Sequence, residues 1–187
     1  MKIKVIAILF IVVVCCANSK AAPLLQEDAA AQPNAGKSLP DSFVSVLAEV
    51  KAKTKIPVLL PTELPAPFNG AKHAIVAKAT AGGYAMELYY DLEMGDAGFA
   101  ATFAAQNNSH YSLRELSNVR EVKLAAGITG FFRAVSCGGS CAGANLWWEQ
   151  GAVQYQIQLR LPSTQRERKQ QRIITAVANS SILAGPR

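Results

Sequence analysis

The segment from Val153 to Leu161 alternates strictly between apolar and polar side chains. Its apolar positions are Val153, Tyr155, Ile157, Leu159 and Leu161, and three glutamines and an arginine stand between them. Successive side chains of a β-strand point to opposite faces, so this strand buries one face and exposes the other. A sheet that is wet on one side is typical of antiparallel pairing. The segment therefore predicts an antiparallel sheet with one covered face.

Further segments with strand character precede it. They are His73–Ala79, whose His73, Ile75, Ala77 and Ala79 share one face, and then Tyr84–Tyr90, Gly98–Ala105, Val119–Leu124, Ile128–Ser136 and Leu146–Trp148. Gly82-Gly83 and Glu149-Gln150-Gly151 are turn signals between consecutive segments. The alanines of 98–105 also permit a helix. The run 57–61 has a proline at each end, so it is expected to be an edge strand or an extended segment.

Two helices are predicted, one on each side of these strands. The first starts at Asp41, carries an apolar stripe and ends near Lys53. Its stripe consists of Phe43, Val46, Leu47 and Val50. The second begins with a capping box formed by Thr164 and Glu167 and ends at Gly185-Pro186. Its stripe consists of Ile173, Ile174, Val177, Ala178, Ser181 and Ile182.

This order of elements predicts an α+β fold. We expect a mainly antiparallel sheet of about five or six strands, flanked by an N-terminal and a C-terminal helix. Residues 39–187 suffice for one domain of ordinary size. Residues 22–38 are rich in alanine, proline and small polar side chains, which is typical of a flexible linker.

Residues 1–21 have the pattern of a secretory signal peptide. Lys2 and Lys4 precede an apolar run over 5–14, and small residues suited to signal peptidase follow. The run is shorter than the roughly 20 residues that span a bilayer, and no transmembrane helix is expected in the mature chain. Export to the periplasm or the extracellular space is therefore predicted. Lipid anchoring at Cys15 or Cys16 is the less favoured alternative, because the small-residue sites explain the segment without it.

The net charge of +6 is unevenly distributed. The last 28 residues hold six basic side chains and one acidic side chain. Such a segment can attract an anionic lipid, a polysaccharide or a nucleic acid, and it can equally be a solvated helix face. Nucleic acid is not expected as a partner, because the protein is predicted to be exported and aromatic residues do not alternate with the basic ones.

The C-terminal third resembles a group of uncharacterised bacterial exported domains. The resemblance lies in Trp148, Gly151, Tyr155-Gln156-Ile157 and Ser180-Ser181, a hairpin with a Trp-Gly-Tyr-x-Ile pattern followed by a C-terminal helix. It implies a fold and a compartment. It brings no catalytic residue to this chain.

Cys137 and Cys141 enclose Gly-Gly-Ser and are expected to form a disulfide, since cysteines close in sequence pair in oxidising compartments. A redox-active pair is the alternative. Its usual signature has two intervening residues rather than three, and two thiolates are only half of a zinc site. No metal and no cofactor are predicted.

Catalytic residues are not predicted, although two groups of residues could in principle supply them. His73 and His110 are the only histidines, and no Gly-x-Ser-x-Gly motif accompanies them. Glu87, Asp91, Glu93 and Asp96 form an acidic cluster, which is more simply a solvated or calcium-binding loop than a pair of glycosidase carboxylates.

Trp147 and Trp148 are candidate ligand contacts. Adjacent strand residues face opposite sides, so one ring is expected in the core and the other half-exposed near Tyr89 or Phe132. An exposed aromatic ring can stack on a sugar or anchor a partner. The sequence thus predicts an exported, non-catalytic domain that binds a glycan, a lipid or an envelope protein, with a small secreted hydrolase or a thiol-disulfide protein as alternatives.

Overall fold

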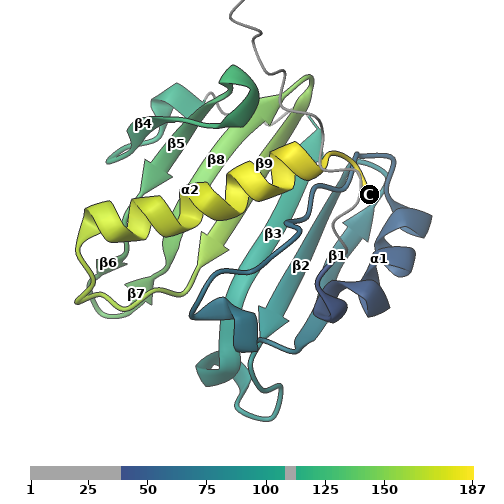
Figure 1. Ribbon diagram of the computed structural model, residues 1–187, viewed down its shortest axis with the longest axis horizontal. Helices are drawn as coiled ribbons and strands as arrows, with labels where there is room; N and C mark the ends of the chain where they lie inside the picture. The colour runs from purple at the N-terminus through teal and green to yellow at the C-terminus, as the bar shows by residue number, and fades with distance from the viewer. Residues whose placement is uncertain (1–38, 108–112) are drawn as a thin grey trace, which may run out of the picture. The chain divides into compact units, whose positions relative to one another are not determined.

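The computed structural model describes residues 39–107 and 113–187. The predicted signal peptide, the predicted linker and His110 lie outside the described residues. Helix α1 (Asp41–Lys53) precedes all the strands and helix α2 (Glu167–Ala184) follows them (Figure 1). The predicted α+β class with two flanking helices is confirmed.

Seven strands of the described part form one antiparallel sheet, in the order β1-β2-β3-β9-β8-β5-β4. The strands are β1 (His73–Thr80), β2 (Gly83–Tyr89), β3 (Phe99–Asn107), β4 (Arg120–Lys123), β5 (Thr129–Arg133), β8 (Ala144–Gln150) and β9 (Val153–Leu159), with β6 (Ser136–Cys137) and β7 (Cys141–Ala142) as a separate hairpin. The sheet exceeds the expected five or six strands because every segment with strand character joins it.

The sheet consists of two meanders that meet at its centre. Strands β1, β2 and β3 form the first, and β4, β5, β8 and β9 form the second. They join where β3 pairs with β9, with Phe103 opposite Ile157. This pairing brings together segments that lie about fifty residues apart in sequence. It also determines which loops meet at the sheet's ends.

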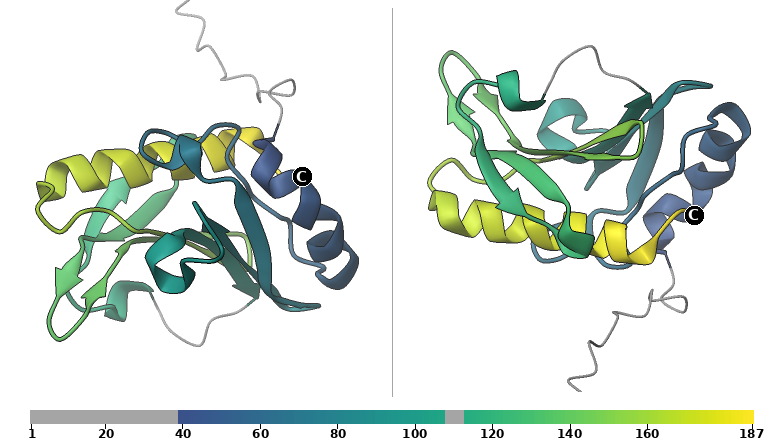
Figure 2. Two further views of the ribbon diagram at one scale, coloured as in Figure 1. Left: turned by 90° about the horizontal axis from the view of Figure 1, so that it is seen from below. Right: turned by 90° about the horizontal axis from the view of Figure 1, so that it is seen from above.

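Both helices and the inward side chains of the strands share one hydrophobic core. Phe43 of α1 packs edge-on against Phe103 of β3, with ring centroids 5.1 Å apart. Ile174, Val177 and Ala178 of α2 are buried in the same core, as their spacing predicts. Figure 2 shows α2 lying along one side of the strands. No helix in the described ranges is long and apolar enough to span a membrane.

The proline-bounded run 57–61 lies extended across this core, as expected. Leu59 forms an isolated bridge with Pro186, just beyond α2. The Leu59 amide donates a hydrogen bond to the Tyr84 hydroxyl at 3.1 Å. The Tyr155 hydroxyl donates to the Pro57 carbonyl at 3.1 Å. Two core tyrosines therefore hold the run in place through its backbone.

The face of β1 that the alternation groups together points toward solvent. His73, Ile75 and Ala77 are exposed, while Ala74 and Val76 pack against the core. A shift of register between Val76 and Lys78 interrupts the alternation further along the strand. The alternation of side chains therefore identifies β1 as a strand. Which of its two faces is buried depends on where α1 packs.

The predicted capping box of α2 is wrong. Thr164 is exposed and lies in a turn closed by the Gln165 amide, which donates to the Pro162 carbonyl at 3.0 Å. The helix begins two residues after this turn, and no side chain caps it. Its predicted end is confirmed, because Gly185 has a φ of 72°, which favours glycine.

Candidate functional site

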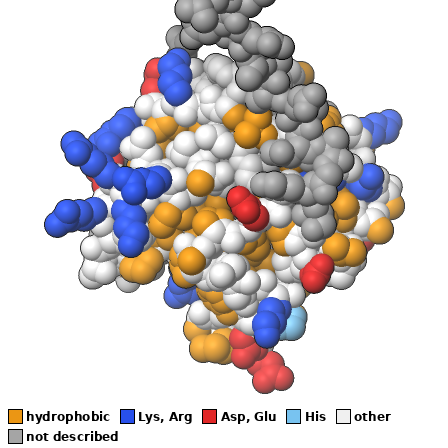
Figure 3. All heavy atoms as spheres, viewed as in Figure 1, with side chains coloured by type: hydrophobic (Ala, Val, Ile, Leu, Met, Phe, Trp, Pro, Cys, Tyr) orange, Lys and Arg blue, Asp and Glu red, His pale blue; other side chains and the backbone are white. Residues whose placement is uncertain are grey.

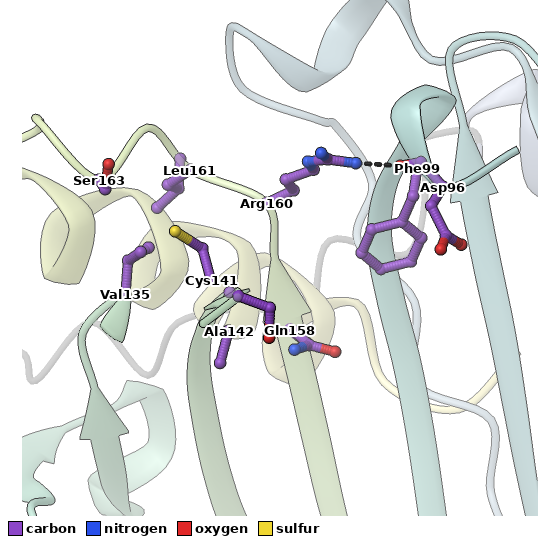
Figure 4. Close-up of a pocket in the computed structure, with 11 residues that line it drawn as sticks. Asp96, Phe99, Val135, Cys141, Ala142, Gln158, Arg160, Leu161 and Ser163 are labelled. Carbon is purple, nitrogen blue, oxygen red and sulfur yellow. Dashed lines mark hydrogen bonds between the residues drawn. The ribbon is translucent and has the colours of Figure 1, made fainter. Parts of the chain in front are cut away.

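A cavity of about 530 Å³ lies where β3 begins and β9 ends (Figure 4). Its lining comes from three stretches that are distant in sequence but meet because β3 pairs with β9 and β9 with β8. The lining residues are Asp96, Phe99, Val135, Ser140, Cys141, Ala142, Gly143, Gln158, Arg160, Leu161 and Ser163. The cavity is therefore a product of the tertiary fold.

Arg160 is the cationic group of the cavity. It follows β9, and its guanidinium extends toward Asp96, whose backbone carbonyl accepts a hydrogen bond from it (Figure 4). The Asp96 carboxylate points away from the guanidinium in the same view. The Arg160 side chain is exposed, and since a guanidinium has five N–H donors, this bond leaves donors for a ligand.

The remaining lining combines apolar and hydroxyl groups. Phe99, Val135 and Leu161 supply apolar surface, and Ser140 and Ser163 supply hydroxyls that can donate or accept hydrogen bonds. Binding pockets typically pair a mostly apolar lining with a few polar groups that orient the ligand. The cavity has both components.

The disulfide hairpin forms one wall. Cys137 lies opposite Cys141 across the β6–β7 pair, and the two are bonded, with their Cα atoms 4.0 Å apart. The predicted disulfide is thus confirmed. Both cysteines are exposed, and Cys141 lines the cavity. The bridge holds the Gly-Gly-Ser turn closed beside Arg160.

Gly143 lets this wall approach β9 closely. A Cβ atom at this position would come within 2.7 Å of the Leu159 carbonyl oxygen, closer than side-chain carbons approach backbone oxygens. The Gly143 carbonyl accepts a hydrogen bond from the side-chain amide nitrogen of Asn145 at 2.7 Å. The side-chain oxygen of Asn145 accepts a hydrogen bond from the side chain of Gln156 at 2.8 Å. Asn145 is only 2% exposed, so these buried side-chain hydrogen bonds hold Gly143, and with it the cavity wall, in place.

Gln170 connects the other two sides of the cavity. Its side chain accepts a hydrogen bond from the Val135 amide at 2.9 Å and donates one to the Gln165 carbonyl at 2.7 Å. The residue belongs to α2 and is 2% exposed. It therefore ties the stem of the disulfide hairpin to the loop that carries Ser163.

Phe99 is positioned by its neighbour on β2. Its ring packs edge-on against Tyr89, with centroids 5.7 Å apart. The Tyr89 hydroxyl donates to the Glu87 carboxylate at 2.8 Å. That hydrogen bond raises the pKa of Tyr89, because it stabilises the protonated phenol.

Neither tryptophan lines the cavity, and neither is half-exposed as predicted. Trp148 is 1% exposed and stacks on Tyr155 in the main core. Trp147 is 9% exposed and packs with Leu113 and Phe131 on the other face of the sheet. The prediction that one of the two rings is half-exposed near Tyr89 or Phe132 is wrong: both are buried, and Trp147 lies opposite Phe131 of β5.

A cation also covers Trp147. The Arg133 guanidinium lies 4.9 Å from the centre of its ring. Any contact of Trp147 or Trp148 with a ligand stays a prediction. For Trp147, such a contact would require the Arg133 side chain or the segment around Leu113 to move aside.

The predicted acidic cluster does not converge on one point. Among its four carboxylate residues, Asp96 alone lines the cavity. The Asp91 carboxylate accepts a hydrogen bond from the Glu93 amide, and Glu87 is bound by Tyr89. His73 is exposed at the start of β1. The described residues contain no group of three or more His, Cys, Asp or Glu side chains that could hold a metal ion.

Comparisons with protein-family models, with curated proteins and with solved structures find no match for this chain. The site must therefore be interpreted from its own chemistry. It offers a guanidinium, hydroxyls and apolar walls, which suit the binding of an amphiphilic anion.

In the sequence, Arg160 is one of several basic residues near the C-terminus and is not distinguished as a ligand-binding residue. Its position at the end of the amphipathic strand, just before Leu161 and Pro162, was the available signal. Gly143 and Gln170 carried no signal in the sequence, because their importance arises from contacts with distant strands and loops.

Proposed function

We propose that this protein is an exported, non-catalytic binding domain whose cavity holds a small organic anion with an apolar body. The observation that carries the proposal is that the Arg160 guanidinium, which donates to the Asp96 backbone carbonyl, lines the same cavity as the apolar surface of Phe99, Val135 and Leu161. Alkyl carboxylates such as fatty acids belong to this chemical class.

The chemistry of the lining supports this ligand class. A carboxylate accepts two parallel hydrogen bonds from a guanidinium, which gives both orientation and affinity. The apolar wall removes the rest of the ligand from water, at about 25 cal/mol per Å² of buried apolar surface. A ligand that lacks either component would use half of the site.

Binding rather than catalysis fits the groups at hand. Ser140 and Ser163 are exposed, and a serine nucleophile requires a base within hydrogen-bond reach. The described lining supplies one carboxylate, that of Asp96, and no histidine. We therefore assign the serines to ligand binding through their hydroxyls.

Export rests on two features of the chain. The first is the pattern of charge and apolar residues over residues 1–21, which is typical of a signal peptide. The second is the Cys137–Cys141 disulfide, since such bonds persist in oxidising compartments. Together they support a site of action in the periplasm or outside the cell.

Calorimetric titration of the chain with decanoate, and with decanol as the neutral analogue, tests the proposal. Hydrogen bonds to charged groups contribute about 1.5–3 kcal/mol, so Arg160→Gln should weaken decanoate binding about ten-fold or more. Lys51→Gln makes the same change of charge on α1 and should leave it unaltered. Equal affinity for decanoate and decanol, or equal loss in both variants, would refute the proposed role of Arg160.

The exposure of the disulfide supports thiol-disulfide exchange as a second candidate function. Cys137 and Cys141 are both exposed, and Cys141 lines the cavity, so an attacking thiolate can reach the disulfide. Acceleration of insulin reduction by the wild type, lost in the variant with serine at both positions, would support this function. Insulin turnover at the uncatalysed rate would exclude it for that substrate.

A further inference from the structure

A strongly basic surface covers the first half of α2. It consists of Arg166, Arg168, Lys169 and Arg172, together with Arg120 of β4. These side chains are exposed, and Figure 3 shows Lys and Arg gathered over the beginning of α2. Glu167 lies among them and forms an ion pair with Arg120, with a nitrogen–oxygen distance of 3.0 Å. The set of six ionised groups therefore keeps a net charge of +4.

The surface is hollowed rather than flat. A shallow depression of about 640 Å³ runs between β4 and α2. It is lined by Arg120, Arg168, Gln171, Arg172, Thr175, Ala176 and Asn179. Three guanidinium groups from two elements thus border one depression, where amide and hydroxyl groups add further donors.

This placement of charge opposes the stability of the helix. Arg168 and Arg172 stand four residues apart, where like charges repel each other. The first turns of α2 hold the basic residues and its last turn holds none, the reverse of the arrangement that a helix dipole favours. An anionic partner over the depression would relieve the repulsion between Arg168 and Arg172. It would also offset the unfavourable interaction of the basic residues with the helix dipole.

We propose that this basic surface binds the phosphate headgroups of an anionic lipid bilayer. The guanidinium groups are spread over the outside of α2 and β4, which matches an array of phosphates better than one enclosed ion. No aromatic side chain lines the described depression, so it lacks the stacking surface with which proteins hold single-stranded nucleic acids. The buried stripe of α2 faces the sheet, so the contact is electrostatic and peripheral.

Vesicle flotation with the full chain tests the proposal. The chain should bind vesicles of phosphatidylglycerol mixed with phosphatidylcholine more tightly than vesicles of phosphatidylcholine alone. The neutral vesicles account for any binding by the apolar run over 5–14. Salt raised from roughly 0.1 M to about 1 M should release the protein, because the Debye length falls from about 10 Å to about 3 Å.

Paired substitutions locate the contact. Each basic residue near an anionic surface contributes about five-fold to binding, so Arg168→Gln with Arg172→Gln should weaken it about 25-fold. The control pair Lys51→Gln with Lys55→Gln removes the same charge from an exposed region elsewhere. Circular dichroism verifies that both variants remain folded.

Three results would overturn the proposal. The first is equal loss of vesicle binding in both paired variants, which would mean that net charge alone attracts the protein. The second is vesicle binding that salt does not weaken. The third is tight binding to heparin without binding to anionic vesicles, which would assign the surface to a soluble polyanion.

Discussion

Replacing Tyr84 with phenylalanine should destabilise the fold by removing one buried hydrogen bond. Tyr84 is 3% exposed, and its hydroxyl accepts a hydrogen bond from the Leu59 amide. Without it, a buried amide would lose its partner, which costs about 1–3 kcal/mol. Tyr155→Phe should cost less, about 0.5–1.5 kcal/mol, because the Pro57 carbonyl belongs to an exposed residue that water can reach.

The same tyrosines predict a loss of stability at alkaline pH. Burial raises the pKa of Tyr84 well above its ordinary value, and it raises the pKa of Tyr155 to about 12. The unfolded chain releases these protons near pH 10, while the folded chain retains them. Their contribution is therefore complete below pH 10 and decreases above it, by about 1.4 kcal/mol per pH unit for each tyrosine. For Tyr155 the loss should reach about 2 kcal/mol by pH 12.

Urea unfolding, followed by circular dichroism from neutral pH to above pH 10, measures both effects. Each phenylalanine variant should be less stable than the wild type at neutral pH and should lose stability less steeply above pH 10. Tyr90→Phe, at an exposed site, is the control and should stay within about 0.5 kcal/mol of the wild type at neutral pH. Wild-type stability in Tyr84→Phe would refute the assignment of the buried hydrogen bond. An unchanged loss of stability above pH 10 in a variant that carries both Tyr84→Phe and Tyr155→Phe would refute the role of the two phenols.

Two further substitutions test the cavity wall. Gly143→Ala should destabilise the protein by about 1–3 kcal/mol, because its Cβ would collide with the Leu159 carbonyl, whereas Gly138→Ala has free space and should change thermal unfolding little. Replacing Cys137 and Cys141 with serine opens a five-residue loop and should cost about 2 kcal/mol, measured by urea unfolding. If Gly143→Ala is as stable as the wild type, Gly143 does not pack closely against Leu159. If the variant with serine at both cysteine positions is as stable as the wild type, the disulfide does not stabilise the cavity wall.

Local sequence patterns predicted the elements well where packing follows the period. The alternation of Val153–Leu161 and the stripe of α1 match the structure because each element buries one regular face. The pairing of β3 with β9 could not be predicted, since no local pattern specifies which distant strand becomes a neighbour. The predicted capping box did not form because Thr164 lies in a turn, which the hydrogen bond between Gln165 and Pro162 closes.

The candidate site was predicted only in part. The disulfide followed from the spacing of two cysteines in a chain predicted to be exported, and it forms one wall of the cavity. The contribution of Arg160 depends on where Asp96 and Phe99 lie, and these residues are set by the β3–β9 register. The prediction of a half-exposed tryptophan failed because Leu113 covers Trp147 on a face of the sheet that the strand pattern alone would leave open.

Nuclear magnetic resonance titration of the labelled protein with decanoate tests the central claim most directly. Saturable shifts of backbone amides are expected in residues 96–99, 140–143 and 158–163, the stretches that meet at Arg160. In Arg160→Gln these shifts should need about ten-fold more decanoate, or more, to reach the same extent. Saturable shifts that instead centre on the far end of the sheet, around Lys78 and Gln154, would contradict it.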